Sequence, residues 1–286
     1  MRISTRGCTM QVRRVAGPAE FLAATLALRS ADPLATNIHG SIATGAAAGR
    51  SYERAFWFVV EDDAAQVVGA AVWTLPHKLL VTPMPLDAAR ALGEAAGRLD
   101  VAVHGVIGPA AVAPVVAEAA APGAALSTYM GERLLVLGDY VAPRPVPGTP
   151  RAVTSADLDE AERWLDAFTA EAGVLVVNNR AAVEHSLGRL WFWELNGVPV
   201  SMAGHAPVVE TPSAVVARVG PVYTPPAYRR RGHAGAVTAT VVEHLLPQVD
   251  RVMLYTDAAN PTSNAIYERL GFRHVADVVD LDVVPR

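Results

Sequence analysis

Apolar and polar positions in the second half of the chain follow two successive spacings. Residues 214–219 are mostly apolar, as in a buried strand, and apolar residues then recur at helical intervals from Val237 to Leu245. Pro225 and Pro226 separate the two patterns and cannot continue a paired strand, because proline has no N–H to donate. The pattern therefore predicts a strand, a loop and a helix, in that order.

The flanking residues extend this unit into a domain of alternating strands and helices. Asn196-Gly197 lies between two apolar runs and is typical of a two-residue hairpin turn. Acidic residues follow Ser155, as is common in the first turn of a helix. We predict strands at 151–153, 190–195, 198–206, 214–224, 252–256 and 272–284, and helices that begin after Ser155, span 180–187, end before Pro247 and span 261–270.

The first half alternates in a similar way and is separated from the second by a proline-rich stretch. Four prolines between residues 141 and 150 predict a stiff, extended connector. The expected organisation is an N-terminal α/β domain over 1–140, a linker over 141–150 and a second domain over 151–286. Within the first domain we predict strands at 11–15, 56–60, 66–75, 78–82, 101–107 and 133–137, and helices at 18–29, 86–99 and 110–121, with a weak helix inside 32–49.

Composition narrows the class of protein. The 286 residues suit about two domains, and 51% hydrophobic and 18% charged residues with a net charge of −4 are typical of a globular protein. Three adjacent arginines are too few for a nucleic-acid surface. A single cysteine, Cys8, cannot form an internal disulfide. The start lacks the apolar core of a signal peptide, and no apolar run is long enough to span a membrane. We expect a cytoplasmic protein.

The loop after the strand at 214–224 has the features of an anion site. Arg229, Arg230 and Arg231 precede Gly232, and the helix follows directly. Free N–H groups and the positive end of the helix dipole would meet at this loop, which suits a phosphate. The chain has neither the Gly-x-Gly-x-x-Gly fingerprint of dinucleotide-binding proteins nor the Gly-Lys-Ser/Thr of nucleotide hydrolases here. Which phosphate ligand the loop would bind is left open by these two motifs, and the alternative is an exposed basic turn without a ligand.

The residues that follow make the chain resemble a known family. Residues 229–234 fit the pattern Arg/Gln-x-x-Gly-x-Gly/Ala, and a second strand leads to Asn260 and then to Asn264-Ala-Ile-Tyr267 and Gly271-Phe272. This combination resembles the GNAT superfamily of acetyl-CoA-dependent N-acetyltransferases. The resemblance implies an α/β (α+β) fold with a mixed central sheet flanked by helices, and it implies acetyl-CoA as co-substrate without a metal.

The resemblance also implies roles for individual residues. The pyrophosphate of acetyl-CoA would lie on the backbone amides of the loop, with arginine side chains adding charge, and its pantetheine arm would pair with the preceding strand. A backbone N–H of that strand would face the thioester oxygen. The implied cofactor-binding residues are Val222, Tyr223, Thr224, Arg229, Arg230, Arg231, Gly232, His233, Ala234, Gly235, Asn260 and Asn264.

Two of these roles have alternatives in the sequence itself. Asn260 either contacts the coenzyme or serves as a turn residue ahead of Pro261. Tyr267 either protonates the departing thiolate, as the resemblance implies, or packs in the core of its helix. The expected reaction is direct attack of an amine on the thioester through a tetrahedral intermediate. Its general base is not evident, and the candidates are Glu171, Glu184, Glu194, His205 and a water chain.

The first half contains a hint of an internal repeat. Trp57-Phe-Val-Val, an acidic turn and residues 67–73 resemble Trp191-Phe-Trp-Glu, the Asn-Gly turn and residues 198–204. We expect either a second, degenerate GNAT-like domain without coenzyme binding or an unrelated α/β cap. Gly105 to Pro109 stands near the place of the missing loop.

The sequence favours an N-acetyltransferase acting on a small-molecule or peptide amine. We keep two alternatives: a non-catalytic acetyl-CoA- or CoA-binding module, and a related acyl or aminoacyl transferase on the same fold. We expect no nucleic acid and no membrane as partner. An apolar edge of the first domain would suit a homodimer.

Overall fold

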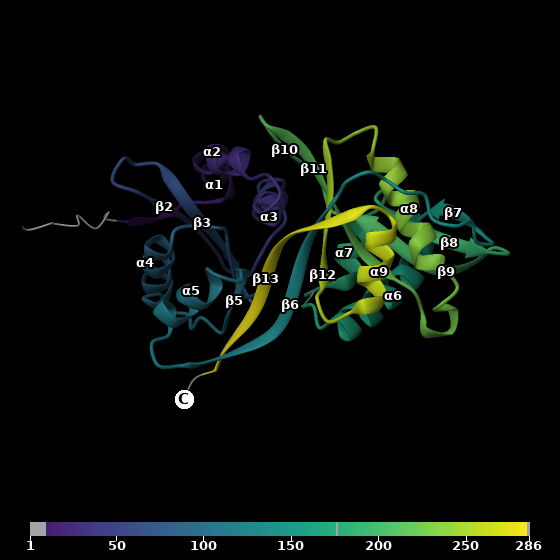
Figure 1. The fold of residues 1–286 in the computed structure, drawn as a ribbon. Helices are drawn as coiled ribbons and strands as arrows, with labels where there is room; N and C mark the ends of the chain where they lie inside the picture. The colour runs from purple at the N-terminus through teal and green to yellow at the C-terminus, as the bar shows by residue number, and fades with distance from the viewer. Residues whose placement is uncertain (1–9, 176, 285–286) are drawn as a thin grey trace, which may run out of the picture. The chain divides into compact units, whose positions relative to one another are not determined.

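The computed structural model describes residues 10–175 and 177–284, which form two compact units (Figure 1). Unit 1 contains the chain up to Arg133, residues Thr211–Ser213 and the chain from Ala276 onward. Unit 2 contains Leu134–Glu210 and Ala214–Val275. Cys8 lies outside the described residues. Of the helices in the described ranges, none is long and apolar enough to cross a membrane.

Unit 1 alternates strands and helices around one sheet. Its elements are β1 (Gln11–Val15), α1 (Pro18–Ala24), α2 (Leu26–Ala31), α3 (Asn37–Ala47), β2 (Ala55–Glu61), β3 (Val67–Thr74), β4 (Leu79–Val81), α4 (Leu86–Gly97), β5 (Gly105–Pro109), α5 (Ala113–Ala120) and the first part of β6 (Ala125–Leu137). The strands β1 to β4 pair antiparallel in sequence order, and β4 pairs parallel with β5.

The last strand of the chain completes the sheet of unit 1. This strand, β13 (Phe272–Val284), begins in unit 2, but from Ala276 onward it belongs to unit 1. It pairs antiparallel with β5, and Asp280 lies opposite Ile107. The expected second domain over 151–286 therefore differs from unit 2 at its C-terminal end. The sequence does not predict that the end of β13 belongs to unit 1, because the apolar pattern of a strand does not identify the strand with which it pairs.

Small residues explain how α4 and α5 pack in unit 1. A Cβ on Gly93 would lie 2.4 Å from the carbonyl oxygen of Val116, and a Cβ on Gly97 would lie 2.3 Å from that of Ala120. Any larger residue would push the helices apart. The small residues of α4 are thus needed for the close contact between α4 and α5.

Several predicted elements of the first half differ in the structure. The helix expected at 18–29 is two helices that join at Thr25, and the weak helix is the 11-residue α3. The strand expected at 101–107 lies at Gly105–Pro109, where Gly105 and Gly108 allow close approach of neighbouring strands. The strand expected at 133–137 begins eight residues earlier, at Ala125.

Unit 2 includes the end of β6, which was expected in the first domain. Its other elements are β7 (Thr149–Ala152), α6 (Leu158–Ala172), α7 (Asn179–His185), β8 (Leu190–Leu195), β9 (Val198–His205), the start of β10 (Val209–Thr211), β11 (Ala214–Tyr223), α8 (His233–Leu245), β12 (Arg251–Asp257), α9 (Pro261–Arg269) and the start of β13. From β7 onward these follow the predicted order, to which the structure adds the short strand β10. The strand order is β6-β12-β11-β9-β8-β7, and only β11 and β12 among the pairs with a recorded register are parallel.

Helices cover both faces of the sheet of unit 2. Met202 on β9 packs with Trp164 of α6, whereas the next residue, Ala203, packs with Val241 of α8. Because successive side chains of a strand point to opposite faces, α6 and α8 lie on opposite faces. The α8 face holds the apolar core between α8, α9 and the strands.

The proline-rich segment 141–150 packs on unit 2 and does not join the units. The amide of Val141 donates to the carbonyl of Leu270 at 3.1 Å, and the indole Nε1 of Trp193 donates to the carbonyl of Pro147 at 2.9 Å. The change from unit 1 to unit 2 falls inside β6, ahead of this segment. A stiff, extended backbone is compatible with a linker between domains and with a segment packed on one domain. The two long-range hydrogen bonds show that residues 141–150 are packed on unit 2.

Candidate functional site

The loop between β11 and α8 presents a run of backbone donors. In the described part of the chain, none of the N–H groups from Arg230 to Gly235 donates to a protein acceptor. Arg230 and Gly232 have positive φ angles of 63° and 87°. Such turns direct neighbouring N–H groups toward one side, and the last three of these groups belong to the first turn of the 13-residue helix α8. The arrangement fits an anion with several oxygens.

Gly232 is required by its surroundings as well as by its conformation. Its φ of 87° lies in the left-handed region, which favours glycine. A Cβ here would lie 2.8 Å from Cγ1 of Val146, which belongs to the proline-rich segment. Sequence reasoning missed Val146, because nothing in the pattern places residue 146 beside residue 232.

The three arginines of the loop have different surroundings. Arg229 donates from Nε to the carbonyl of Thr224 at 2.8 Å and from Nη2 to Glu171 of α6 at 2.5 Å. Its guanidinium also lies 5.8 Å from the ring centroid of Tyr223. Arg230 and Arg231 are exposed, and no ion-pair partner is recorded for either within the described ranges. Their charges are available to an anionic ligand.

His233 lies in the first turn of α8 and is almost fully buried. Only 3% of the residue is exposed, and neither ring nitrogen has a hydrogen-bond partner among the residues that the structure describes. Burial, with a smaller effect of the Arg231 charge, lowers the pKa of His233. The ring is therefore neutral at pH 7.

The end of β11 is held from one side only. β11 pairs with β9 up to Tyr223, opposite Met202, but its recorded pairing with β12 covers only Val216–Arg218. Val222 packs on the α8 face, and Tyr223 packs on the α6 face. Residues 222–224 therefore have one backbone edge that faces away from β9 and has no recorded partner strand. The pantetheine arm is expected at this edge from the resemblance.

The two asparagines after β12 both have structural contacts. Asn260 caps α9, because its Oδ1 accepts from the amide of Ser263 at 3.1 Å. Asn264 donates from Nδ2 to the carbonyls of Asp257 at 3.1 Å and Ala258 at 3.3 Å. The Oδ1 of Asn264 is buried, and it has no partner in the described part of the chain. The cap explains Asn260 without a ligand, whereas the unpartnered oxygen of Asn264 remains available as an acceptor.

Tyr267 lies on α9 with its ring against Phe272. The two ring centroids are 6.0 Å apart in an edge-to-face arrangement, and 9% of Tyr267 is exposed. Burial raises the pKa of Tyr267 to about 12. Within the described ranges, the ring contact with Phe272 is the one side-chain interaction recorded for Tyr267, and its hydroxyl has no recorded hydrogen-bond partner. Tyr267 is thus both a core residue and a protonated phenol at neutral pH.

The carboxylates predicted as bases are all engaged. Glu194 accepts from Arg151 at 2.7 Å, and Glu184 lies 3.3 Å from Arg180. Glu171 accepts from Arg229 and also lies 3.3 Å from the hydroxyl of Tyr223. Each of the three carboxylates therefore has a cationic side chain as a partner.

His205 is buried at the end of β9 among aromatic rings. Its ring stacks on Trp191 at 5.9 Å and lies 6.0 Å from the ring of His244, and its Nδ1 is 2.8 Å from the carbonyl of Ala206. Burial is the main cause of its lowered pKa. His205 is consequently neutral at pH 7, with its ring on the face that α8 covers.

In unit 1 the turn between β4 and α4 occupies the place that the loop between β11 and α8 has in unit 2, but its residues are different. The turn between β4 and α4 covers residues 82–85, so Gly105 to Pro109, which the sequence placed near it, is instead β5. Pro83 and Pro85 in this turn have no N–H, and the turn contains no basic residue. This position of unit 1 therefore lacks the donors that the loop of unit 2 provides.

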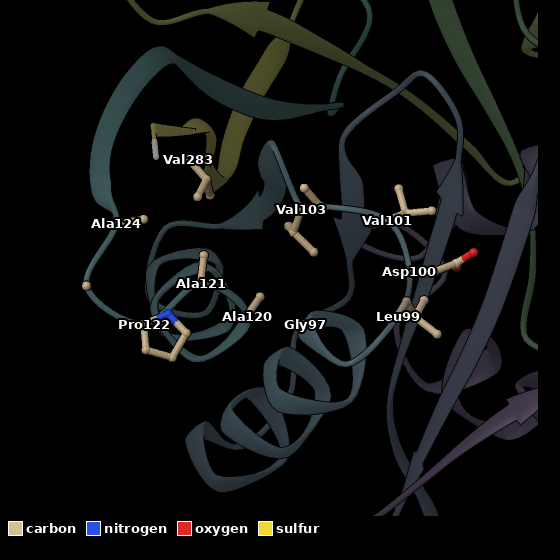
Figure 2. A pocket seen from close by; sticks show the side chains of 12 residues that line it. Gly97, Leu99, Asp100, Val101, Val103, Ala120, Ala121, Pro122, Ala124 and Val283 are labelled. Carbon is tan, nitrogen blue, oxygen red and sulfur yellow. The ribbon is translucent and has the colours of Figure 1, made fainter. Parts of the chain in front are cut away.

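Unit 1 also has a surface hollow at the ends of α4 and α5. Figure 2 shows that it is lined mainly by small apolar side chains, with Val283 of β13 on one side and Asp100 on the other. Asp100 is the one ionisable residue of the lining and pairs with Arg54 at 2.7 Å. The hollow has no group suited to acyl transfer. Within the described ranges, no cluster of side chains could hold a metal ion.

Comparison with known proteins agrees with the order of elements. Residues 210–279 match the model of a family described as FR47-like protein. None of the curated protein sequences is significantly similar to the chain. Among solved structures, a protein described as an acetyltransferase of the GNAT family from Colwellia psychrerythraea is 11% identical, with a TM-score of 0.59 over 96% of this chain and 99% of that one.

Two further structures cover nearly the whole chain. A Drosophila protein is 14% identical, with a TM-score of 0.68 over 96% of this chain and 98% of that one. A tandem GNAT protein from the clavulanic acid biosynthesis pathway is also 14% identical, with a TM-score of 0.60 over 97% and 100%. The predicted resemblance is confirmed: the chain has the fold of the GNAT superfamily, in a form that also matches a tandem GNAT protein.

Proposed function

We propose that the protein is an N-acetyltransferase that transfers the acetyl group of acetyl-CoA to a primary amine. The observation that carries the proposal is the run of N–H groups from Arg230 to Gly235, which lack protein acceptors in the described part of the chain and stand at the positive end of α8. The exposed guanidinium groups of Arg230 and Arg231 flank them. This donor set suits the pyrophosphate and 3′-phosphate of coenzyme A.

The strand before the loop would hold the rest of the coenzyme. Its edge at Val222 and Thr224 is not paired with β12 in the recorded register. The backbone groups of Val222 and the N–H of Thr224 are therefore available to the amides of a pantetheine arm, whereas the carbonyl of Thr224 accepts from Arg229. Asn264 would add the oxygen that has no partner among the described residues. When bound, acetyl-CoA supplies the thioester that an amine attacks.

Tyr267 has the chemistry of the proton donor in this proposal. Its raised pKa, about 12, keeps the hydroxyl protonated at neutral pH, so the proton is available to a departing thiolate. Glu171, Glu184 and Glu194 have cationic partners, and His205 lies among rings on the α8 face. The proposal therefore assigns removal of the amine proton to solvent.

Titration calorimetry with acetyl-CoA tests the binding part of the proposal. Gly232→Glu places a carboxylate among the loop donors and should abolish binding, because the charge repels the pyrophosphate. Gly188→Glu is the matched control: Gly188 has a similar φ of 82° and open space around it, but lies between α7 and β8. Loss of binding in Gly232→Glu alone supports the proposal. Absence of binding in the wild-type protein contradicts it.

Release of free thiol from acetyl-CoA across a panel of amines tests the catalytic part. Amine-dependent release that Tyr267→Phe lowers supports an N-acetyltransferase. Binding without release for any amine favours the non-catalytic CoA-binding module. Release with longer acyl-CoA thioesters, but not with acetyl-CoA, favours a related acyltransferase.

A further inference from the structure

The proline-rich segment 141–150 runs alongside α8 and reaches the loop that carries the free N–H groups. Before the segment begins, the hydroxyl of Tyr140 donates to Glu243, near the end of α8, at 2.6 Å. Further along, Val146 lies against Gly232, because a Cβ added to Gly232 would be 2.8 Å from Cγ1 of Val146. The six steps from Tyr140 to Val146 advance about 19 Å in an extended chain, and the eleven from Gly232 to Glu243 advance about 16 Å in a helix. The similar lengths indicate that the segment is antiparallel to α8.

One side of this segment faces α8, and Arg144 lies on another side. Pro143, Pro145 and Pro147 keep the chain extended, and a chain of this kind has about three residues per turn. Pro143 and Val146, which are three residues apart, are partly buried, whereas the other residues from 141 to 145 are exposed. The exposed Arg144 therefore extends to the side of the segment, about 6 Å along the chain from the contact of Val146 with the loop.

Arg144 adds a third unpaired guanidinium to this end of α8. In the part of the chain that the structure describes, no ion pair or side-chain hydrogen bond is recorded for Arg144, Arg230 or Arg231. Arg229, in contrast, is engaged by Glu171. Like charges that lie close together without a carboxylate repel one another, so a bound anion would relieve their repulsion. The three charges therefore favour a ligand with more than one anionic group.

The third phosphate group of coenzyme A fits this place. In the proposed function the pyrophosphate lies on the N–H groups of residues 230–235, and the 3′-phosphate is joined to it through a single ribose. This phosphate is a monoester with a charge of about −1.5 to −2 at pH 7, and a guanidinium can bind it through two parallel hydrogen bonds. Because the proline-rich segment is stiff, an arginine on it can meet the phosphate without the cost of ordering a flexible chain.

We propose that Arg144 binds the 3′-phosphate of acetyl-CoA and makes the site selective for coenzyme A over its 3′-dephospho form. This inference rests on the proposed function, and it adds a residue outside the loop that determines which coenzyme is bound. The whole pantetheine arm separates the 3′-phosphate from the thioester, so Arg144 affects binding and not the chemical step.

Titration calorimetry of the full-length protein with acetyl-CoA and with 3′-dephospho-acetyl-CoA tests the inference. The wild-type protein should bind acetyl-CoA more tightly by about tenfold or more, because the 3′-phosphate gains charge-assisted hydrogen bonds. Arg144→Gln should weaken binding of acetyl-CoA by about fivefold or more and binding of the dephospho form by less than about twofold. An effect of net charge alone would weaken both ligands alike, since both carry the pyrophosphate.

Two further variants make the test specific. Arg251→Gln removes the same charge from an exposed residue at the start of β12, which pairs with Val216 near the start of β11. Arg251 therefore lies at the opposite end of these parallel strands from the loop, and its replacement should leave both affinities unchanged. Arg144→Lys keeps the charge without the planar fork, so its affinity for acetyl-CoA should lie between those of the wild type and Arg144→Gln.

NMR of the phosphorus nuclei of bound acetyl-CoA provides a direct readout of the contact. The 3′-phosphate monoester titrates with a pKa of about 6 when free, and a guanidinium beside it lowers this pKa. The lowering should be smaller in Arg144→Gln than in the wild type and in Arg251→Gln, and the pyrophosphate resonances should be the same in all three proteins.

The outcomes separate this inference from the proposed function. If the wild-type protein binds neither ligand, the proposed function fails and this inference fails with it. If the wild-type protein binds both ligands equally, or if Arg144→Gln keeps the wild-type preference for acetyl-CoA, the role of Arg144 is overturned while the proposed function stands.

Discussion

Replacing Gly232 with alanine is expected to destabilise unit 2 by about 2–5 kcal/mol, as the sum of two contributions. At a φ of 87° an L-residue costs roughly 1–2 kcal/mol more than glycine, because its Cβ crowds the backbone. The added Cβ would also lie 2.8 Å from Cγ1 of Val146, and relief of such overpacking costs about 1–3 kcal/mol.

Two other glycines of unit 2 separate these contributions. Gly188 has a φ of 82° with nothing within 4 Å of the added Cβ, so Gly188→Ala should cost only the conformational part, roughly 1–2 kcal/mol. Gly235 lies inside α8, and the nearest atom to its added Cβ is 3.8 Å away. Gly235→Ala should therefore stabilise the helix, by up to about 1 kcal/mol.

Urea-induced unfolding monitored by tryptophan fluorescence measures all three variants, because three of the five tryptophans, Trp164, Trp191 and Trp193, lie in unit 2. The expected order of stability is Gly235→Ala, wild type, Gly188→Ala and then Gly232→Ala. Adding Val146→Ala to Gly232→Ala removes the crowded methyl groups, so the two changes together should cost less than the sum of the single changes. The reasoning is refuted if Gly232→Ala is as stable as the wild type.

Three further predictions concern charge and proton transfer. Lys78→Met leaves Asp280 and Asp282 of β13 without their cationic partner and should lower the free energy of unfolding by about 1–3 kcal/mol. Loss of the exposed ion pair in Arg98→Ala should cost less than ~0.5 kcal/mol. Equal losses of the two variants in urea unfolding would contradict this. Tyr267→Phe should lower kcat by about 100-fold or more with the Kd of CoA unchanged, and an unchanged kcat would remove Tyr267 as the acid. Hydrogen bonds from Arg151 hold the pKa of Asp157 well below its usual range, so its stabilising effect is present above about pH 4 and is lost as the pH falls through the folded-state pKa. The difference in stability between wild type and Asp157→Asn should therefore shrink in acid, and a constant difference in unfolding experiments from pH 7 to pH 3 would contradict this.

The elements of unit 2 could be predicted from the sequence because local signals agree there. Asn196-Gly197 forms the turn between β8 and β9, and Gly232 precedes α8, as the patterns of turn residues and helical spacing predicted. These features depend on neighbours in the chain. The loop residues 229–235 could be singled out for the same reason, since their chemistry is local to one strand–loop–helix unit.

What the sequence missed depends on contacts between distant residues. The pairing of the end of β11 depends on its register on β9, which shifts by one residue between Val219 and Val222. No periodic pattern reveals such a shift. The prolines of residues 141–150 likewise predict extended backbone but not the partner on which it lies, which here includes Trp193. The ion pairs of Glu171, Glu184 and Glu194 are also long-range or surface contacts that residue type alone does not predict.

The exchange of β13 has a consequence for synthesis of the chain. β5 is complete once residue 109 has been made, but the strand that pairs with it, from Val278 to Asp282, is made about 170 residues later. Domains usually fold as they emerge from the ribosome, the N-terminal one first. Here the sheet of unit 1 must wait, with the edge of β5 open, until unit 2 has been translated. Lys78, the only lysine of the chain, then forms ion pairs with Asp280 and Asp282 and so binds β13 to the rest of unit 1. A protein that ends after residue 140 would lack the strand that pairs with β5 and both ion-pair partners of Lys78. Residues 1–140 alone therefore do not contain the whole of unit 1.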